Sequence, residues 1–594
     1  MRWTLRSHSI PDESLVSRLA AEARVSPVVA QLLVARGIHN AYDAHRFLTP
    51  EFSHLHSPYQ MLGMKAAAER LRAAIARQEK ILIYGDYDVD GTTAIVILKA
   101  AIELCGGTAD YHVPHRIREG YGMRDEVIER AAAEGVRLII SVDTGIRAFA
   151  AAETTQRLGV DLIVTDHHLP QAEGVPQALA VLNPNQSGCQ YPCKDLCGAG
   201  VAFKLAQALL EHAGRGRLLP SFLKVVAIAT IADAVALVGE NRVFTKIGLE
   251  GLRSPVNPGL KALLEVSALE SNNGRGFTAG DVAFRLAPRL NAAGRMDVAK
   301  DVIDLFTVRN QAQAREIATR LDQLNAERQQ EEQRIVSEIQ ARLEGDAELR
   351  DAWCIVVDGD GWHKGVIGIA ATRVVERYCR PTLVITRDGD YAQGSGRSIH
   401  AFHLLEALES CAHLFTRFGG HAHAAGFALP AAHIPELRIR LDAWARTRLT
   451  PADLEPTLCY DAELRLDEIT PQLFDALRRL EPFGMGNPQP VFVARNLKLL
   501  APPRVMKEKH AKLRVRQTTG AGEPGRSAIP RAFDAIAWRM AERVQRDGIL
   551  AGDLLDLAFT IEENSHPEFG GLQLSVCDVV KAENSSKQQA ASRD

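Results

Sequence analysis

Three aspartates at alternate positions follow the first strongly apolar, β-rich run of the chain. The run Ile81–Tyr84 leads directly into Asp86, Asp88 and Asp90. A strand that ends in this pattern and continues into a helix, expected over Thr92–Ala101, presents carboxylates at the carboxyl edge of a parallel sheet, where α/β proteins bind ligands. Clustered carboxylates repel one another, so we expect a divalent cation such as Mg²⁺ or Mn²⁺ at this edge.

Two other interpretations of this stretch are a solvated acidic turn and an EF-hand calcium loop. An EF-hand needs a helix before the loop and a glutamate near its twelfth position. Here a strand-like run precedes the loop, and Lys99 and Ala100 occupy the region where the EF-hand glutamate would be required. The pattern therefore favours a metal site of another kind.

Further apolar segments end in the same kind of residue. Strands are expected over Ala109–Val113, Val136–Val142 and Asp161–Thr165, with helices between them, as in a doubly wound parallel sheet. The ionisable residues that follow such segments are Asp143, His167, His168 and, further on, Asp233. Carboxylates and neutral imidazoles gathered at one sheet edge suit a pair of divalent ions that activates water for attack on a phosphate ester.

Composition limits the remaining possibilities. The chain has 594 residues, 46% hydrophobic and 24% charged, which predicts three to five folding units with ordinary cores. Its net charge of -3 means that a polyanion must bind in a local groove. No apolar run is long enough to cross a bilayer, and the start lacks the apolar core of a signal peptide, so we expect a cytoplasmic protein without membrane contact. Cys189, Cys193 and Cys197 lack a CxxC pair, which favours scattered thiols over a zinc site.

The order of the segments predicts a fold of the α/β class with several parts. We expect an N-terminal helical segment (1–55), a catalytic domain with a parallel sheet (56–306), a long connecting helix (307–345), a smaller α/β domain (346–450), an oligonucleotide-binding (OB) β-barrel (451–581) and a disordered tail (582–594). The long helix, periodic from 307 to 343, could instead be an interaction coiled coil, but its apolar seam is short and broken.

The strand-end motifs resemble those of a known family when they are taken in order. Four of them resemble the motifs of the DHH phosphoesterase superfamily: Asp86–Gly91, Val142–Gly145, Asp166–His168 and Ile231–Asp233. Two later segments, Gly394–Ser398 and Gly419–Gly426, resemble the associated DHHA1 domain. The resemblance covers about residues 60–580 and is strongest to the single-strand-specific exonucleases of this superfamily.

This resemblance implies 5′-to-3′ degradation of single-stranded DNA to mononucleotides with two Mn²⁺ or Mg²⁺ ions, in recombination and repair, mismatch repair included. It implies that the metal ligands are Asp86, Asp88, Asp90, Asp143, His167 and Asp233, with Asp143 as the bridge. Asp86 is implied as a ligand although related enzymes use a histidine near this place. His168 is expected to contact the scissile phosphate. The family also suggests a monomer that works with a single-strand-binding protein and a helicase.

Strand polarity requires a pocket for the terminal phosphate, because two metal ions do not distinguish strand ends. Ser395, Arg397 and the adjacent glycines offer a guanidinium and free backbone N–H groups, which would form an anion nest unless the segment is a flexible turn. By resemblance, further phosphate and base contacts are expected from Arg116, Tyr121, Arg289 and Arg295. His363, His421 and His423 are expected to line the cleft between the two α/β domains.

The barrel region carries a cationic segment. Its members are Lys507, Lys509, His510, Lys512, Arg514 and Arg516, as a groove for a single strand requires, although few aromatic residues interleave with them. Two other functions remain open: a phosphodiesterase for very short or cyclic oligonucleotides, and a silent scaffold of the same fold. The barrel argues against the first, and the retained carboxylates argue against the second.

Overall fold

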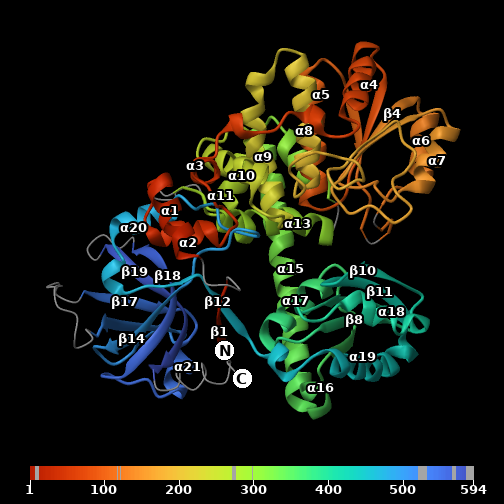
Figure 1. Ribbon diagram of the computed structural model, residues 1–594. Helices are drawn as coiled ribbons and strands as arrows, with labels where there is room; N and C mark the ends of the chain where they lie inside the picture. The colour runs from red at the N-terminus through yellow and green to blue at the C-terminus, as the bar shows by residue number, and fades with distance from the viewer. Residues whose placement is uncertain are drawn as a thin grey trace. The chain divides into compact units, whose positions relative to one another are not determined.

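The computed structural model describes residues 1–6, 12–116, 118–120, 122–269, 276–296, 299–518, 531–564 and 570–582. The chain forms two compact units (Figure 1). One consists of Met1–Glu51 with Pro456–Asp594, and the other is Phe52–Glu455. Among the described residues, no helix is both long and apolar enough to cross a membrane.

The first lobe of Phe52–Glu455 is built on a parallel sheet, as predicted. Its strands are β2 (Lys80–Tyr84), β3 (Ala109–His112), β4 (Val136–Val142), β5 (Asp161–Thr165) and β6 (Ala180–Leu182), in the order β3-β2-β4-β5-β6. One face packs against α4 (Met64–Ala76), α5 (Val89–Leu104) and α8 (Gly198–His212), and the other against α6 (Asp125–Ala133) and α7 (Phe149–Arg157). Neighbouring residues of β2 therefore enter different cores. Ile81 and Ile83 pack on the face covered by α4, α5 and α8, and Leu82 and Tyr84 pack on the face covered by α6 and α7.

A helical region follows this sheet and ends in the long helix. Its elements are α9 (Leu219–Ala232), α10 (Gly239–Gly251), α11 (Pro258–Val266), α12 (Ala279–Asp281), η4 (Val282–Leu286), α13 (Ala287–Met296), α14 (Lys300–Thr307) and α15 (Gln311–Gly345). The predicted helix from Thr307 is wrong at its start, because α14 ends there. The Asn310 side chain accepts the backbone N–H groups of Ala312 and Gln313, so it caps a new helix.

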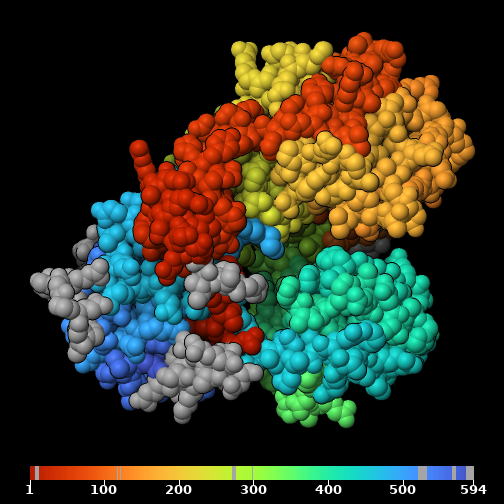
Figure 2. All heavy atoms as spheres, viewed as in Figure 1, coloured from red at the N-terminus to blue at the C-terminus, as the bar shows by residue number. Residues whose placement is uncertain are grey.

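The second lobe is a smaller α/β domain beyond α15 (Figure 1). Its sheet contains β7 (Ile355–Asp360), β8 (Thr382–Asp388), β9 (Tyr391–Arg397), β10 (Arg417–His421) and β11 (Ala424–Pro430), in the order β10-β11-β9-β8-β7. The helices are α16 (Ala347–Asp351), α17 (Ile367–Tyr378), α18 (Leu404–Glu409) and α19 (Ile434–Arg448). The space-filling view shows the surface hollowed between the two lobes, with atoms of the green connecting segment deep within it (Figure 2).

The position of β9 corrects one prediction. Ser395 and Arg397 lie in a central strand whose residues pair with β8 on one side and β11 on the other. The sheet therefore engages the backbone groups that an anion nest would need, and the prediction of free N–H groups there is wrong. Only the side chains of this segment are available to bind an anion.

The unit formed by the two ends of the chain contains the barrel. Strands β14 (Phe492–Leu499), β16 (His510–Gln517), β17 (Ala532–Ala537), β19 (Gly571–Lys581) and β18 (Leu554–Asn564) close a ring, because β14 pairs with both β16 and β18. This ring has the strand order of an OB fold. The flanking elements are β13 (Ala462–Glu463), β15 (Arg504–Met506), α20 (Pro471–Arg478) and α21 (Ala541–Arg546).

The N-terminal helices belong to the same unit. They are α1 (Glu13–Ala23), α2 (Pro27–Val34) and α3 (Ala41–Leu48), and their Leu19, Leu32 and Leu33 share one buried core with Phe492 and Leu497 of the barrel. In addition, β1 (Arg2–Leu5) pairs in parallel with β12 (Thr457–Tyr460). The predicted tail, 582–594, lies outside the described residues except for Ala582.

Candidate metal centre and phosphate pocket

The predicted metal ligands meet at the carboxyl edge of the parallel sheet. Three overlapping groups each place one ligand atom per residue within 4.8 Å of the others: Asp86, Asp88 and Asp143; Asp90, His167 and Asp233; Asp143, His167 and His168. The Nε2 atom of His167 lies 3.3 Å from Asp143 Oδ1 and 3.7 Å from Asp233 Oδ2. Asp143 and His167 thus link the groups, which is an arrangement suited to two adjacent ions.

The start of α5 holds two of these carboxylates. The side chain of Asp88 caps the helix by accepting the Gly91 N–H at 3.0 Å. Asp90 lies inside the first helical turn and not in a loop, because α5 begins at Val89 and not at Thr92 as predicted. Its two carboxylate oxygens accept the N–H groups of Gly198 at 2.5 Å and Ala199 at 2.8 Å, at the beginning of α8.

Asp143 depends on the same turn of α8. Its φ of 59° lies in the left-handed region, which aspartate and asparagine tolerate better than most residues. A Cβ atom on Gly198 would lie 2.5 Å from Cβ of Asp143, so only glycine allows α8 to approach this closely. The start of α8 therefore orients Asp90 through hydrogen bonds and makes room for Asp143.

Asp166 is a functional residue that sequence reasoning missed. It is buried, and its Oδ1 lies 2.8 Å from Nδ1 of His168, while its Oδ2 accepts the Ile146 N–H. Burial lowers the pKa of His168, but the hydrogen bond and the charge of Asp166 outweigh burial and raise that pKa above its ordinary value. The signal for it in the sequence is its place as the first residue of the Asp-His-His motif, directly before two expected ligand histidines.

The electrostatics of the cluster fit a bound cation. Burial, followed by repulsion from neighbouring carboxylates, raises the pKa of Asp86 and Asp143 and raises the pKa of Asp233 to about 9. Among the described residues, no hydrogen-bond partner faces the buried atoms Asp86 Oδ1, Asp143 Oδ1, His167 Nε2 and Asp233 Oδ2. Hard oxygen donors with a neutral imidazole, turned towards each other and otherwise unpartnered, suit Mn²⁺ or Mg²⁺.

We expect added Mn²⁺ to raise the melting temperature of chelator-treated protein by roughly 5 °C, and by more at pH 8 than at pH 6. Without a cation, protonation of the clustered carboxyl groups stabilises the fold. This stabilisation is complete only below about pH 3.8, and it is lost as the pH rises through the raised pKa of about 9. The ion replaces the lost protons. Scanning calorimetry tests this: Asp233→Asn should lose most of the shift, whereas Asp110→Asn, at an exposed position of β3, should keep it. An equal shift in both variants would contradict the assignment.

Three predicted substrate-binding arginines gather near the metal cluster. The guanidinium of Arg116 lies 4.9 Å from the ring centre of Tyr87. Burial and then Arg116 lower the pKa of Arg295 to about 10, with Arg328 and Arg397 contributing, and burial and Arg116 also lower the pKa of Arg397. Arg397 donates to Oγ of Ser395 at 3.0 Å. Crowded, buried cations of this kind are ready to bind an anion.

Other predicted substrate contacts have different outcomes. Arg289 of α13 donates to Asp322 of α15 at 2.8 Å and to the carbonyl of Arg285, contacts that connect the two helices. Tyr121 lies outside the described residues. His421 lies at the end of β10 on the surface, and its partial burial, followed by the charges of His423 and Arg397, lowers its pKa.

The three cysteines at 189, 193 and 197 are free thiols in the core of the first lobe and join no metal-holding group among the described residues.

Comparison with known proteins places these features in a family. The chain matches the DHH family, N-terminal domain, at residues 80–230, the DHHA1 domain at 351–447 and the RecJ OB domain at 460–578. It is 37% identical to the single-stranded-DNA-specific exonuclease RecJ of Bacillus subtilis (strain 168), over 98% of this chain and 71% of that protein.

The chain belongs to the RecJ family.

A second RecJ relative, from Escherichia coli (strain K12), is 36% identical over 87% of this chain and 91% of its own length. Among solved structures, RecJ from Thermus thermophilus in complex with Mn²⁺ has a TM-score of 0.81 and 28% identity, and covers 98% of this chain and 79% of that one. The same RecJ in complex with Mg²⁺ has a TM-score of 0.75. RecJ proteins with either ion thus share this fold, which agrees with the cation-binding chemistry of the cluster.

Proposed function

We propose that this protein is a single-strand-specific DNA exonuclease that uses two Mn²⁺ or Mg²⁺ ions and degrades strands from the 5′ end to mononucleotides. The observation that carries the proposal is the convergence of five aspartates and two histidines into linked ligand groups. The RecJ relatives, named as single-stranded-DNA-specific exonucleases, support the substrate class. When bound, such a pair of ions activates water and stabilises the leaving oxygen.

The chain's own residues supply ligation, a proton and orientation. The residues that would hold the ions are Asp86, Asp88, Asp90, Asp143, His167 and Asp233, and Asp143 belongs to two of the ligand groups. The Asp166 carboxylate accepts the Nδ1 proton of His168 at 2.8 Å, so the proton that His168 can transfer is the one on Nε2 of its imidazolium form, and the ring faces the cluster beside Asp143. His168 can therefore bind a phosphate oxygen and supply a proton to the departing 3′ oxygen.

The arginines near the cluster would give the enzyme its polarity. Arg397 and Ser395 of β9, with Arg116 and Arg295, offer side-chain donors to a terminal 5′ phosphate. Gly368 in the first turn of α17 packs against them: a Cβ there would lie 2.9 Å from Ser395 Oγ and 3.1 Å from Arg397 Nη2. A strand anchored by this phosphate would present the first internal linkage to the metal centre, so that one nucleotide leaves per cycle.

The barrel has an outer face rich in cationic residues that suits a single strand, although Asp534 of β17 pairs with Lys512 there at 2.8 Å. On β16, Lys512, Arg514 and Arg516 alternate with buried Ala511, Leu513 and Val515. Arg504 of β15 lies opposite Lys512, and Lys498 of β14 lies opposite Arg516. One end of the face carries aromatic rings, since His510 and Trp538 stack edge to face with centres 5.0 Å apart. The sequence did not associate Trp538 with the cationic segment.

We expect Trp538→Ala to weaken binding of a 20-nucleotide single strand roughly tenfold, because base–aromatic stacking contributes about 1–3 kcal/mol. Trp538 is half exposed, so its removal should leave the barrel folded. Fluorescence anisotropy of a labelled strand in EDTA measures the change. Leu550→Ala, at another exposed apolar position of the barrel unit, is the control and should bind like the wild type. Equal affinity of all three proteins would remove Trp538 from the binding face.

Digestion of end-labelled DNA tests the proposed function. With Mn²⁺, a 5′-label should appear at once as a mononucleotide, a 3′-label should appear last, and blunt duplex should persist. A phosphodiesterase for short or cyclic oligonucleotides would instead prefer dinucleotides over a 50-nucleotide strand. A silent scaffold would release neither label.

We further propose that the enzyme acts in the cytoplasm as a monomer, in recombination and in repair, including mismatch repair. A helicase and a single-strand-binding protein are the partners that would supply and protect its substrate. Light scattering of the purified protein tests the monomer, and stimulation of strand release by each partner tests the association.

A further inference from the structure

The loop between β7 and α17, residues 361–365, borders two arginines of the proposed phosphate pocket. A Cβ atom on Gly365 would lie 2.4 Å from the carbonyl oxygen of Arg295, so this loop meets the end of α13 backbone to backbone. Gly368 follows three residues later, which is nearly one helical turn, and a Cβ atom there would lie 3.1 Å from Nη2 of Arg397. The loop and the first turn of α17 therefore form a wall that both arginines share.

Three hydrogen bonds in series connect this wall to the long helix α15. Oε1 of Glu331, on α15, accepts the backbone N–H of His363 at 3.1 Å. Nδ1 of His363 then accepts the Gly365 N–H at 3.1 Å, and the Gly365 carbonyl accepts from Nη1 of Arg295 at 3.3 Å. Burial lowers the pKa of His363, which favours the neutral ring that can accept at Nδ1. The series thus runs from α15 to an arginine of the pocket.

The carboxylate at the start of this series is itself held in place. Arg334, one turn later on α15, donates to both oxygens of Glu331, at 2.9 and 2.7 Å. These hydrogen bonds lower the pKa of Glu331, so that its carboxylate is ionised at neutral pH. An ionised acceptor forms the stronger hydrogen bond to a backbone N–H. Arg334 also donates to the carbonyl of Gly361, at the other end of the loop, at 3.4 Å.

The apolar core holds the two ends of the wall but not its middle. Trp362 and Val366 are buried in a core that α15 and α17 share. Between them, His363 is only half-buried and Lys364 is exposed. The backbone of this middle stretch must therefore be fixed by polar contacts, and Glu331 supplies the contact that comes from α15.

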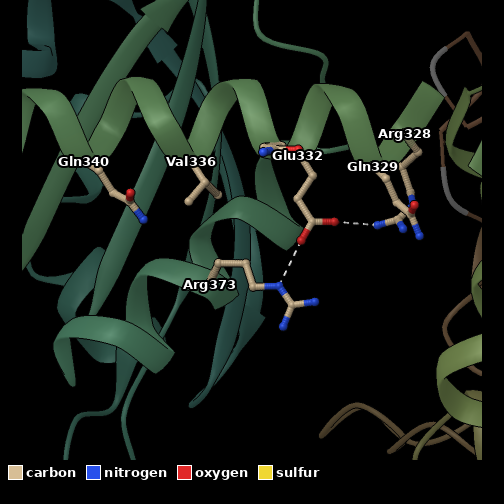
Figure 3. A pocket seen from close by; sticks show the side chains of 7 residues that line it. Arg328, Gln329, Glu332, Val336, Gln340 and Arg373 are labelled. Atoms are coloured by element: carbon tan, nitrogen blue, oxygen red, sulfur yellow. Dashed lines mark hydrogen bonds and ion pairs between the residues drawn. The ribbon is translucent and has the colours of Figure 1, made fainter. Parts of the chain in front are cut away.

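The body of α17 has a separate polar anchor on α15. Oε1 of Glu332 accepts from Arg373 at 2.8 Å, and its Oε2 accepts from Arg328 at 2.6 Å, as Figure 3 shows. A groove of about 490 Å³ lies between the two helices beside this anchor. Glu331 thus acts on the loop that leads into α17, whereas Glu332 holds the helix. A change at Glu331 should shift the loop without detaching α17.

We propose that Glu331 is a positioning residue for recognition of the terminal 5′ phosphate, an inference that rests on the proposed function. Through His363 and Gly365 it fixes the wall that Arg295 and Arg397 share. Two guanidiniums bind oxygens of one phosphate well only when both are aimed at the same point. The metal-ligand groups do not include Glu331, so hydrolysis itself should not depend on it.

Steady-state degradation of a 20-nucleotide single strand that carries either a 5′ phosphate or a 5′ hydroxyl tests this proposal. Glu331→Ala should lower the preference for the phosphate, measured as the ratio of the two kcat/KM values, roughly fivefold. The loss should appear as a higher KM on the phosphorylated strand, with kcat unchanged. Glu331→Gln keeps an oxygen that can accept the His363 N–H, so it should retain most of the preference.

Two further variants separate a positioning role from a general effect. Glu327→Ala removes an exposed glutamate one turn earlier on α15, where the carboxylate accepts from Gln323, and should match the wild type. In an Arg397→Ala background, Glu331→Ala should change the ratio less than about twofold, because a pocket that lacks one arginine no longer depends on their alignment.

An unchanged ratio in Glu331→Ala, or equal losses on both strands, would overturn the role of Glu331 while the wild type still prefers the phosphorylated strand. A further fivefold fall in the Arg397→Ala background would also overturn it, since Glu331 would then act independently of the pocket. A wild type that releases nucleotides without any preference for a 5′ phosphate would instead overturn the proposed phosphate pocket and this inference together.

Discussion

Asp143→Asn is expected to reduce metal-dependent release of nucleotides at least roughly 1,000-fold while the protein stays folded. Asp143 is shared between the ligand groups, so its loss removes the charge that holds two ions together. Asparagine is the informative replacement because it is uncharged, similar in size and compatible with the φ of 59° at this position. Alanine would add backbone strain to the loss of the ligand.

The fold of this variant can be checked separately from its activity. Removing one carboxylate from a cluster whose members repel one another should not lower the melting temperature of metal-free protein at neutral pH. Titration with Mn²⁺ should show weakened binding. Asp110→Asn makes the same chemical change at an exposed strand position and should remain fully active. Turnover of Asp143→Asn within tenfold of the wild type would refute its role as a shared ligand.

The second large effect is expected from Arg397→Ala. We predict a loss of roughly 10- to 100-fold in kcat/KM on 5′-phosphorylated single strands, because a hydrogen-bonded charge contributes about 1.5–3 kcal/mol. The loss should fall mainly on KM, since Arg397 belongs to the arginine cluster and to none of the metal-ligand groups. Strands with a 5′ hydroxyl should be degraded at nearly the wild-type rate.

Matched measurements on both strand ends separate this effect from a general defect. Arg417→Ala removes an exposed arginine from β10, in the same sheet, and should change neither substrate. Equal losses on phosphorylated and hydroxylated strands would mean that Arg397 supports the fold of the second lobe. In that case Arg116 and Arg295 would have to bind the terminal phosphate without it.

Much of the metal centre follows from local sequence. Apolar β-rich runs that stop at Asp86, Asp143 and His167 predict strands of a parallel sheet, and such strands all present their carboxyl ends at one edge. The long helix was also evident, except at its start. There Asn310 caps α15, and this competes with continuation of the periodic pattern.

Other features could not be predicted because they depend on contacts distant in sequence. Asp90 is oriented by backbone N–H groups of Gly198 and Ala199, more than 100 residues later. Ser395 and Arg397 form a turn-like sequence rich in glycine, yet pairing on both sides makes it a central strand. Tertiary context overrode local propensity there.

The sequence by itself determined the ligand chemistry, the parallel sheet that gathers it and the family to which the motifs point, because strand-end position follows from periodicity within short segments. The tertiary structure alone decided how Asp166 orients His168, that Arg289 binds Asp322 of α15, and that Met1–Glu51 shares a core with the barrel. These outcomes depend on which surfaces are buried against one another. The sequence of one segment does not specify this, because the packing partners can lie hundreds of residues away in the chain.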